Sequence, residues 1–181
     1  STINPNCEVY LFYWNIITPK RINYKLFTDK EAIYSTDPAD CEKYNFKYNN
    51  MFYCEKYYEP YEPCKKNKLF FLGVDKGRAD LLLCLKAVFE ESGIECDIRL
   101  LASGLNKKRR QELKSILTDK RLSYEEYLTQ LQRCSLILDI TQFGQMAPTM
   151  RVMEAIYLSK KLITNNRSLS SYDFYTENNI F

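Results

Sequence analysis

The strongest constraint on the fold is an alternation of strand-like and helix-like segments that begins near residue 68 and continues to the end of the chain. Short apolar or alternating runs are typical of buried strands, and they occur at 69–74, 94–100, 135–140 and 162–164. Segments with helical periodicity lie between and after them, at 80–92, 106–117, 123–131 and 149–159. Strands separated by helices at this spacing form right-handed crossovers. The sequence therefore predicts an α/β fold with a parallel sheet flanked by helices.

Residues 1–66 differ from the rest of the chain because they are rich in Tyr, Asn and Pro. Short strands are predicted at 9–14 and 31–35, and the prolines and charges of 55–68 indicate a connection. We therefore expect two parts, a partial N-terminal region over 1–66 and a parallel-sheet domain over 67–181. Because no Met begins the chain and the pattern stops abruptly, we also expect a fragment that is cut short at its C-terminal end.

Several helix boundaries are marked by capping residues. Asp37 before Pro38 predicts a helix start, because Asp accepts free N–H groups and Pro fits the first turn. Ser123 and Glu126 form a capping box, and Gly93 predicts a helix end. The helix before Gly93 should turn one apolar face inward, formed by Leu82, Leu85, Val88 and Phe89.

Composition excludes several classes of function. The chain contains no histidine, so Ser-His-Asp and Cys-His catalysis and histidine metal sites are excluded within it, and no catalytic residue is assigned. A net charge of +3 does not indicate nucleic-acid binding. The seven cysteines are irregularly spaced, and we interpret them as reduced thiols, mostly small core residues such as Cys84, Cys96 and Cys134. Without a signal peptide or an apolar run long enough to span a membrane, we expect a cytoplasmic protein.

Ligands of an open parallel sheet bind beyond the carboxyl ends of its strands. That rule selects the loops at 73–78, 102–104 and 140–149. In the first loop, Gly73 allows close backbone approach, and Lys76 and Arg78 offer positive charge to a phosphate. The alternative is an ordinary turn whose charges are solvated.

The helix that follows the loop at 140–149 carries further candidates. Its N-terminus at Thr149 and Met150 favours an anion, and Arg151 adds charge. Glu154 lies among apolar neighbours, and its carboxylate could accept hydrogen bonds from a ribose diol. The alternative for Glu154 is a surface glutamate near a helix start.

Two further clusters allow a ligand-binding or a structural interpretation. The basic run at 107–110 could bind anionic lipid, although a solvated helix face is the more common role. The aromatic side chains at positions 10, 12, 13 and 14 could stack on a base or sugar, although core packing is more common. No Asp-x-Asp motif is present, so no metal cofactor is expected.

The segment from Thr149 to Thr164 resembles the donor-site segment of GT-B glycosyltransferases. Glu154-Ala155 stands at the family's Glu-Ala, Ser159 replaces its usual glycine, and a strand follows. Residues 71–78 and 122–140 are similar to the first strand and loop and to the penultimate helix–strand unit of the family's C-terminal domain. Residues 35–44 and 159–166 together resemble bacterial proteins of lipopolysaccharide or capsular polysaccharide synthesis.

The resemblance implies a Rossmann-like donor domain that holds a nucleotide sugar for transfer to a glycan or lipid-linked acceptor. It assigns the donor's ribose to Glu154 and the diphosphate to the helix start around Thr149 to Arg151. The family's acceptor domain, which usually carries the catalytic base, is nearly absent, so we expect donor binding but little transfer by this chain alone. Peripheral association with the inner face of a membrane is compatible with this function. The competing hypotheses are a non-catalytic α/β nucleotide-binding or interaction module and, less well matched by motifs, a nucleotide-sugar epimerase or dehydrogenase.

Overall fold

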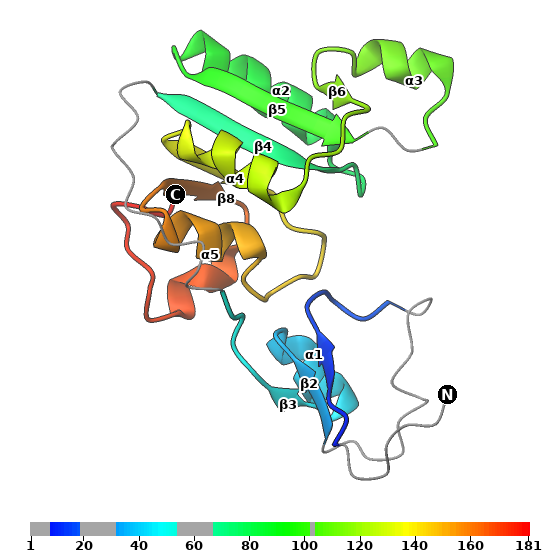
Figure 1. Cartoon of the computed structure of the whole chain (residues 1–181), viewed down its shortest axis with the longest axis vertical. Helices are drawn as coiled ribbons and strands as arrows, with labels where there is room; N and C mark the ends of the chain where they lie inside the picture. The colour runs from blue at the N-terminus through cyan, green and yellow to red at the C-terminus, as the bar shows by residue number, and fades with distance from the viewer. Residues whose placement is uncertain (1–7, 19–31, 54–66, 102–103) are drawn as a thin grey trace.

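The computed structural model describes residues 8–18, 32–53, 67–101 and 104–181. These residues form two parallel sheets, a small one with strand order β1-β2-β3 and a larger one with order β6-β5-β4-β7-β8 (Figure 1). The predicted α/β architecture, a Rossmann-like parallel sheet flanked by helices, is confirmed. The predicted connection at 55–68 falls almost entirely outside the described residues.

The small sheet belongs to the N-terminal part of the chain. Its elements are β1 (Leu11–Tyr13), β2 (Ile33–Ser35), α1 (Pro38–Tyr44) and β3 (Lys47–Tyr48). Both strand pairs are parallel, which places the carboxyl ends of all three strands at one edge. Asp37 caps α1 as predicted, whereas β3 and the parallel pairing were not predicted.

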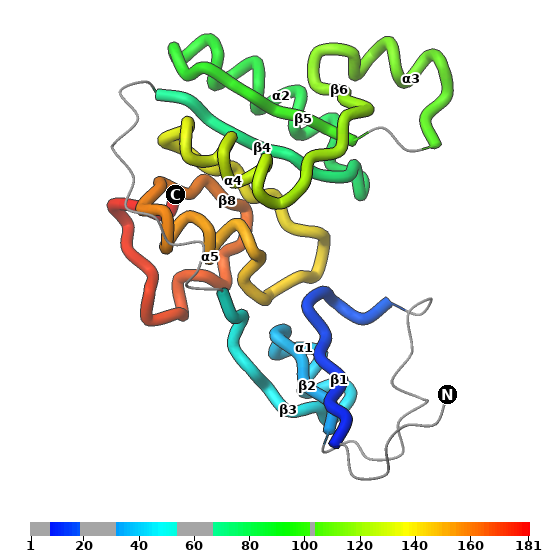
Figure 2. The backbone as a smooth tube through the Cα atoms, viewed as in Figure 1, coloured from blue at the N-terminus to red at the C-terminus, as the bar shows by residue number. Residues whose placement is uncertain are grey.

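The large sheet and its helices follow in the order β4 (Lys68–Val74), α2 (Ala79–Glu91), β5 (Glu95–Leu101), α3 (Lys107–Glu112), β6 (Leu117–Thr118), α4 (Tyr124–Gln132), β7 (Leu136–Asp139), α5 (Met150–Tyr157) and β8 (Lys161–Thr164). Every pairing in this sheet is parallel. A 3-10 helix at Arg167–Ser171 comes after β8. The tube in Figure 2 shows the small sheet as a separate lobe beyond one end of the large one.

Both faces of β4 are covered, which explains its continuous apolar sequence. Phe70 packs with residues of α4 and α5, including Leu128 and Val152. Leu69 and Phe71 point to the other face, where they join a cluster that includes residues of α2. The central strand is therefore fixed on two sides, and its carboxyl end is a rigid base for the loop that follows.

Two details of the predicted helices were wrong. The helix expected over 106–117 ends at Glu112, because the chain turns there and Leu117 pairs with Leu100 in the sheet. Val88 is 50% exposed rather than inward. At about 100° per residue, Val88 lies roughly 120° around the helix from fully buried Leu82, outside the covered face.

The cysteines are only partly core residues. Cys134 is buried and Cys96 half-buried, but Cys84 is exposed, so the expectation of a core role was wrong for Cys84. These three and Cys41 are free thiols, and the other three cysteines lie outside the described residues. Within the part of the chain that the structure describes, no helix is long and apolar enough to cross a membrane.

Candidate functional site

A cavity of about 280 Å³ lies where the carboxyl ends of the two parallel sheets meet. The small sheet contributes residues that follow its strands, namely Trp14 and Asn15 after β1 and Met51 after β3. The large sheet contributes the loop after β4, the loop after β7 and the start of α5. This is the edge of a parallel sheet at which ligands bind.

Asp37 attaches the small sheet to the loop after β7. Its Oδ2 accepts hydrogen bonds from the backbone N–H groups of Met146, at 2.9 Å, and Ala147, at 3.1 Å. Its Oδ1 accepts from Ala39 N at 3.0 Å and so caps α1. From the other side, Asn166 Nδ2 donates to the carbonyl oxygens of Met146 and Ala147. The loop that lines the cavity is therefore held by both sheets.

Arg78 is held at the carboxyl-terminal edge of the large sheet. Its guanidinium donates to the carbonyl oxygen of Val74 through Nη2, at 3.0 Å, and to that of Ile140 through Nη1. The preceding turn is closed by Asp75, whose Oδ1 accepts from the backbone N–H of Arg78 and of Ala79. Arg78 thus bridges the carboxyl ends of β4 and β7.

Arg151 lies beside it in the first turn of α5. Its Nη2 donates to Leu72 O at 2.6 Å, and its Nη1 lies 3.6 Å from the buried carboxylate of Asp139. Asp139 also accepts from the hydroxyl of Thr149, the N-cap of α5, at 2.9 Å. Among the described residues, no hydrogen-bond partner is found for the buried Nε of Arg151.

The two guanidinium groups form a concentrated positive site. Both lie over the ring of Phe71, with Cζ 4.9 Å from its centroid for Arg78 and 4.7 Å for Arg151. Burial, and next the charge of Arg151, lower the pKa of Arg78 to about 10. Lys76 also lines the cavity, whereas no Asp or Glu is among the described residues that do. Two like charges held this close are stabilised by an anion, and phosphate matches the fork geometry of arginine.

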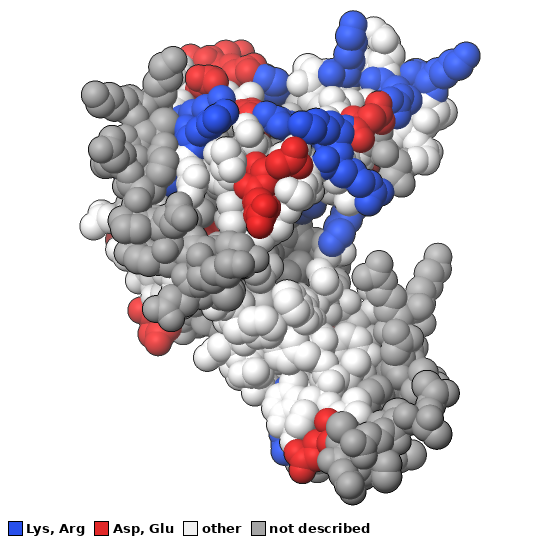
Figure 3. Space-filling view, in the orientation of Figure 1, with Lys and Arg blue, Asp and Glu red and all other residues white. Residues whose placement is uncertain are grey.

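The surface charge is unevenly divided between the two lobes. In Figure 3, Lys and Arg side chains gather over the α2–α3 end of the molecule, on the side of the large sheet. The described surface of the small lobe is mostly uncharged in the same view. Within the cavity itself, the cationic side chains also come from the large-sheet lobe, whereas the small lobe contributes the uncharged residues Trp14, Asn15 and Met51.

Gly73 is required by the close approach of the two arginines. A Cβ at this position would lie 2.8 Å from Nη2 of Arg78, 3.0 Å from Nη2 of Arg151 and 3.2 Å from Cζ of Phe71. The two guanidinium groups are the ends of flexible side chains, so they could move aside without disturbing the sheet. A methyl group at Gly73 would therefore displace the cations rather than unfold the strand.

We expect Gly73→Ala to weaken binding of a phosphorylated ligand about fivefold or more while changing the unfolding free energy by less than about 1 kcal/mol. Titration calorimetry and urea denaturation measure the two effects separately. Gly93→Ala is the control, because Gly93 has a φ of +78° after α2 and its replacement should reduce stability without affecting binding. Equal binding by Gly73→Ala and the unmodified protein would contradict the proposed role of the arginine pair.

Six of the seven predicted donor-site residues line one cavity. These are Gly73, Lys76, Arg78, Thr149, Met150 and Arg151. The seventh, Glu154, does not line it and is only 2% exposed. Of the third predicted loop, 102–104, only Gly104 is described, and it is not among the lining residues.

Glu154 lies on α5 behind the cavity and is held by two tyrosines of α4. Tyr127 donates to its Oε2 at 2.7 Å and Tyr124 donates to its Oε1 at 3.1 Å. Burial raises the pKa of Glu154 to about 7, against the lowering effects of Tyr127, Arg151 and Tyr124. The predicted surface alternative is therefore wrong for Glu154, and its carboxyl group titrates near neutral pH.

The raised pKa of Glu154 makes stability depend on pH. The folded state binds this proton more tightly than the unfolded chain, whose ordinary pKa is 4.5. The contribution of this proton to the free energy of unfolding is complete below pH 4.5 and is lost as the pH rises to about 7. Between about pH 5 and about pH 8, the unmodified protein should lose about 2 to 3 kcal/mol more unfolding free energy than Glu154→Gln. Urea denaturation at both pH values tests this, and parallel curves for the two proteins would contradict it.

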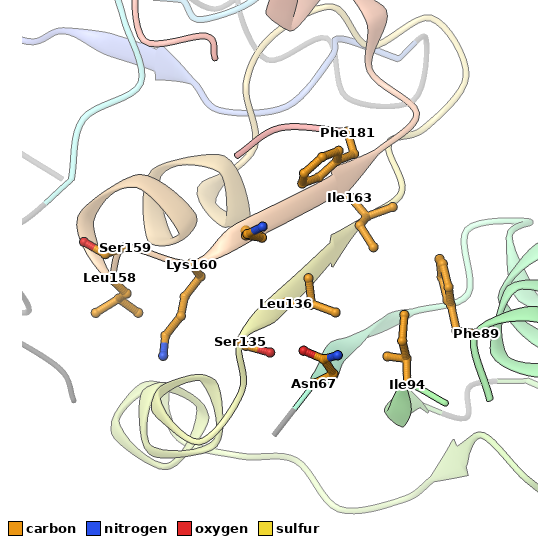
Figure 4. A pocket seen from close by; sticks show the side chains of 11 residues that line it. Asn67, Phe89, Ile94, Ser135, Leu136, Leu158, Ser159, Lys160, Ile163 and Phe181 are labelled. Atoms are coloured by element: carbon orange, nitrogen blue, oxygen red, sulfur yellow. The ribbon is translucent and has the colours of Figure 1, made fainter. Parts of the chain in front are cut away.

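A larger cavity, of about 640 Å³, lies at the other end of the strands (Figure 4). Its walls include residues at the amino ends of strands, among them Asn67 before β4, Ile94 before β5 and Ser135 before β7. Apolar side chains such as Leu136 and Phe181 form much of the rest, and the Nζ of Lys160 donates to Gln132 O at 3.1 Å. The arginine pair lies at the carboxyl ends instead, and we place the ligand there despite the smaller volume.

Sequence reasoning did not assign several residues of the smaller cavity. Asn15 and Met51 of the small lobe and Gln142 and Gln145 of the loop after β7 carry no motif. Trp14 was considered for stacking, but core packing was preferred, whereas the residue is 44% exposed and lines the cavity. Only the pairing of β1 in a parallel sheet could have indicated that Trp14 follows a carboxyl strand end.

No protein-family model matches this chain, and a search of curated proteins finds no significant match. These comparisons therefore identify no family and no activity. Within the described residues, no group of three or more Cys, Asp or Glu side chains is placed to hold a metal ion. What supports a function is the arginine pair, its position on the sheet and the sequence resemblance.

Proposed function

We propose that this chain forms the donor site of a nucleotide-sugar-dependent glycosyltransferase of the GT-B type, acting in lipopolysaccharide or capsular polysaccharide synthesis. The diphosphate of the donor binds to Arg78 and Arg151, and Lys76, which also lines the cavity, adds positive charge. The observation that carries the proposal is the pair of adjacent guanidinium groups over Phe71, at the carboxyl ends of β4 and β7. The proposed acceptor is a glycan or lipid-linked sugar.

A cationic pair at this position suits transfer of a sugar from a diphosphate. When the bond to the sugar breaks, negative charge develops on the departing nucleoside diphosphate. Donors fixed in advance stabilise that charge without reorganisation during the reaction. Arg78 and Arg151 are fixed in this way by the carbonyl oxygens of Val74 and Leu72, and by the ion pair with Asp139.

The nucleoside then extends along α5 toward Glu154. Tyr124, which donates to Glu154, is 36% exposed and so connects this buried carboxylate to the surface. A ribose hydroxyl that takes the place of the Tyr124 hydroxyl at Oε1 would be bound by Glu154. The donor's ribose is therefore proposed to compete with Tyr124 rather than to enter an open site.

The proposal is tested by thermal-shift titration of the chain with UDP, GDP, CMP and ADP, each with and without EDTA. One nucleoside diphosphate should raise the melting temperature selectively, and EDTA should not reduce the effect. The 2′-deoxy form of that nucleotide tests the ribose contact, and it should bind more weakly by about tenfold. Equal binding of the deoxy form would contradict the role of Glu154 while leaving the diphosphate site intact.

Two other results would contradict the proposal itself. If none of the four nucleotides stabilises the chain, the donor site is not formed by these residues, and a non-catalytic interaction module becomes the better account. If all four stabilise it equally, the site binds phosphate without selecting a nucleoside. Titration with inorganic pyrophosphate distinguishes this second case, because it should then bind as tightly as the nucleotides.

A further inference from the structure

The small lobe presents an aromatic ring to the cavity that holds the arginine pair. Trp14 immediately follows β1 and lines the cavity together with Arg78 and Arg151, although it belongs to the other lobe. The residue is 44% exposed. A large aromatic side chain that is half-exposed beside a polar cavity is available to cover the apolar face of a ligand.

Neighbouring rings fix the orientation of Trp14. Phe52 packs edge-on against it, with the ring centroids 4.9 Å apart and an interplanar angle of 73°. The ring centroid of Phe12 in β1 lies 6.1 Å from that of Trp14 and 5.4 Å from that of Phe52. The indole is therefore held by a small aromatic cluster and does not need to be ordered by the ligand.

Amide side chains surround the same space. Asn15 adjoins Trp14, and Gln142 and Gln145 enter from the loop after β7. An amide both donates and accepts hydrogen bonds, as a sugar hydroxyl does. A pyranose has an apolar face of C–H groups and a rim of hydroxyls, so it matches an aromatic ring bordered by amides. A nucleobase also stacks on aromatic rings and hydrogen-bonds with amides, so the comparison of a diphosphate with its nucleotide sugar is the test that distinguishes the two.

We infer that Trp14 is the stacking platform for a pyranose, and that this pyranose is the sugar of the proposed nucleotide-sugar donor. The inference rests on the proposed function, because the diphosphate at Arg78 and Arg151 delivers the sugar to the cavity. The sugar is bound between the lobes, with its apolar face on Trp14 and its hydroxyls near Asn15, Gln142 and Gln145. Trp14 thereby selects sugars that have one continuous C–H face.

Trp14 is the single tryptophan of the chain, so its fluorescence reports directly on this contact. The probes are UDP with UDP-glucose and GDP with GDP-mannose, together with methyl glucoside and methyl mannoside as free sugars. One nucleotide sugar should change the emission of Trp14 more than its own diphosphate does. It should also bind about three- to tenfold more tightly than that diphosphate.

Variants separate stacking from a general structural effect. In Trp14→Ala, followed by calorimetry, the additional affinity of the nucleotide sugar should disappear while the affinity of the diphosphate is retained. Trp14→Tyr should retain part of the additional affinity because a ring remains. Phe143→Ala is the matched control, since Phe143 is fully exposed and does not line the cavity, and it should bind both ligands normally.

The outcomes distinguish this inference from the proposed function. Equal fluorescence changes with the diphosphate and the nucleotide sugar would mean that Trp14 stacks on the nucleobase, and would overturn the inference alone. Unchanged additional affinity in Trp14→Ala would overturn it as well. A response to the free methyl glycosides without any response to the nucleotide sugars would assign the platform to the acceptor. Failure of every diphosphate and nucleotide sugar to bind would overturn both proposals.

Discussion

Arg78→Met is expected to weaken nucleoside diphosphate binding by about tenfold to a hundredfold, the effect of removing a charged hydrogen-bond donor from a phosphate. The folded protein should lose only about 1 kcal/mol, because the guanidinium donates to carbonyl oxygens and leaves no buried carboxylate unpaired. Titration calorimetry gives the first quantity and urea denaturation the second. We therefore expect Arg78 to contribute more to binding than to stability.

Arg109→Met is the matched control for this experiment. The guanidinium of Arg109 is likewise held by hydrogen-bonded partners, in its case Asp80 and Glu112, but Arg109 lies on α3 and does not line the cavity. Its replacement should leave the affinity unchanged because Arg109 lies outside the cavity, and it should change stability little because surface ion pairs contribute little. If Arg78→Met and Arg109→Met bind the diphosphate equally well, the ligand does not contact the arginine pair.

Asp37→Asn is expected to lower the unfolding free energy by about 3 kcal/mol. Asp37 is 2% exposed, and its carboxylate accepts from three backbone N–H groups, two of them in the loop after β7. An amide has one accepting oxygen, so its NH₂ group must face at least one of these donors. The loop after β7 should then loosen, and diphosphate affinity should fall with it.

Asp80→Asn makes the same chemical change at an exposed site. The Asp80 side chain is 81% exposed in the first turn of α2, and its replacement should cost less than about 0.5 kcal/mol. Urea denaturation of both variants makes the comparison. A similar small loss for Asp37→Asn would show that the small lobe is not fastened to the loop by this carboxylate.

The large sheet could be predicted because its central strands are continuous apolar runs, β5 alternates apolar and polar residues, and its helices carry clear end signals. The runs at 69–74 and 135–140 correspond to β4 and β7, and Ser123 forms the predicted capping box of α4. The short elements were harder. β6 consists of two residues and β3 of two, too few to show a period, and each is defined by its partner strand rather than by its own sequence.

The candidate site was predictable only in part. The prediction came from the rule that ligands of a parallel sheet bind beyond the carboxyl ends of its strands. That rule, applied to β4 and β7, selected Gly73, Arg78 and Arg151, which do meet in one cavity. The burial of Glu154 depends on Tyr124 and Tyr127, about thirty residues earlier on another helix. Spacing along one helix carries no information about such a contact.

The contribution of the small lobe could not be predicted for a similar reason. Its strands are three residues long or shorter, and its parallel pairing joins segments separated by about twenty residues along the chain. The position of Trp14 at a carboxyl strand end follows from that pairing. The carboxylate of Asp37, which the sequence indicates only as a helix cap, also holds the loop after β7, and Tyr53 adds a second contact between the lobes by stacking on Tyr157 of α5.

The most direct test of the central claim compares a nucleoside diphosphate with its own nucleoside by titration calorimetry on the unmodified chain. UDP with uridine and GDP with guanosine are the pairs to measure. If the arginine pair binds the diphosphate, one diphosphate should bind measurably and its nucleoside should bind at least about a hundredfold more weakly. Added salt should lower the affinity for the diphosphate. A nucleoside that binds as tightly as its diphosphate, or a diphosphate that does not bind at all, would contradict the claim.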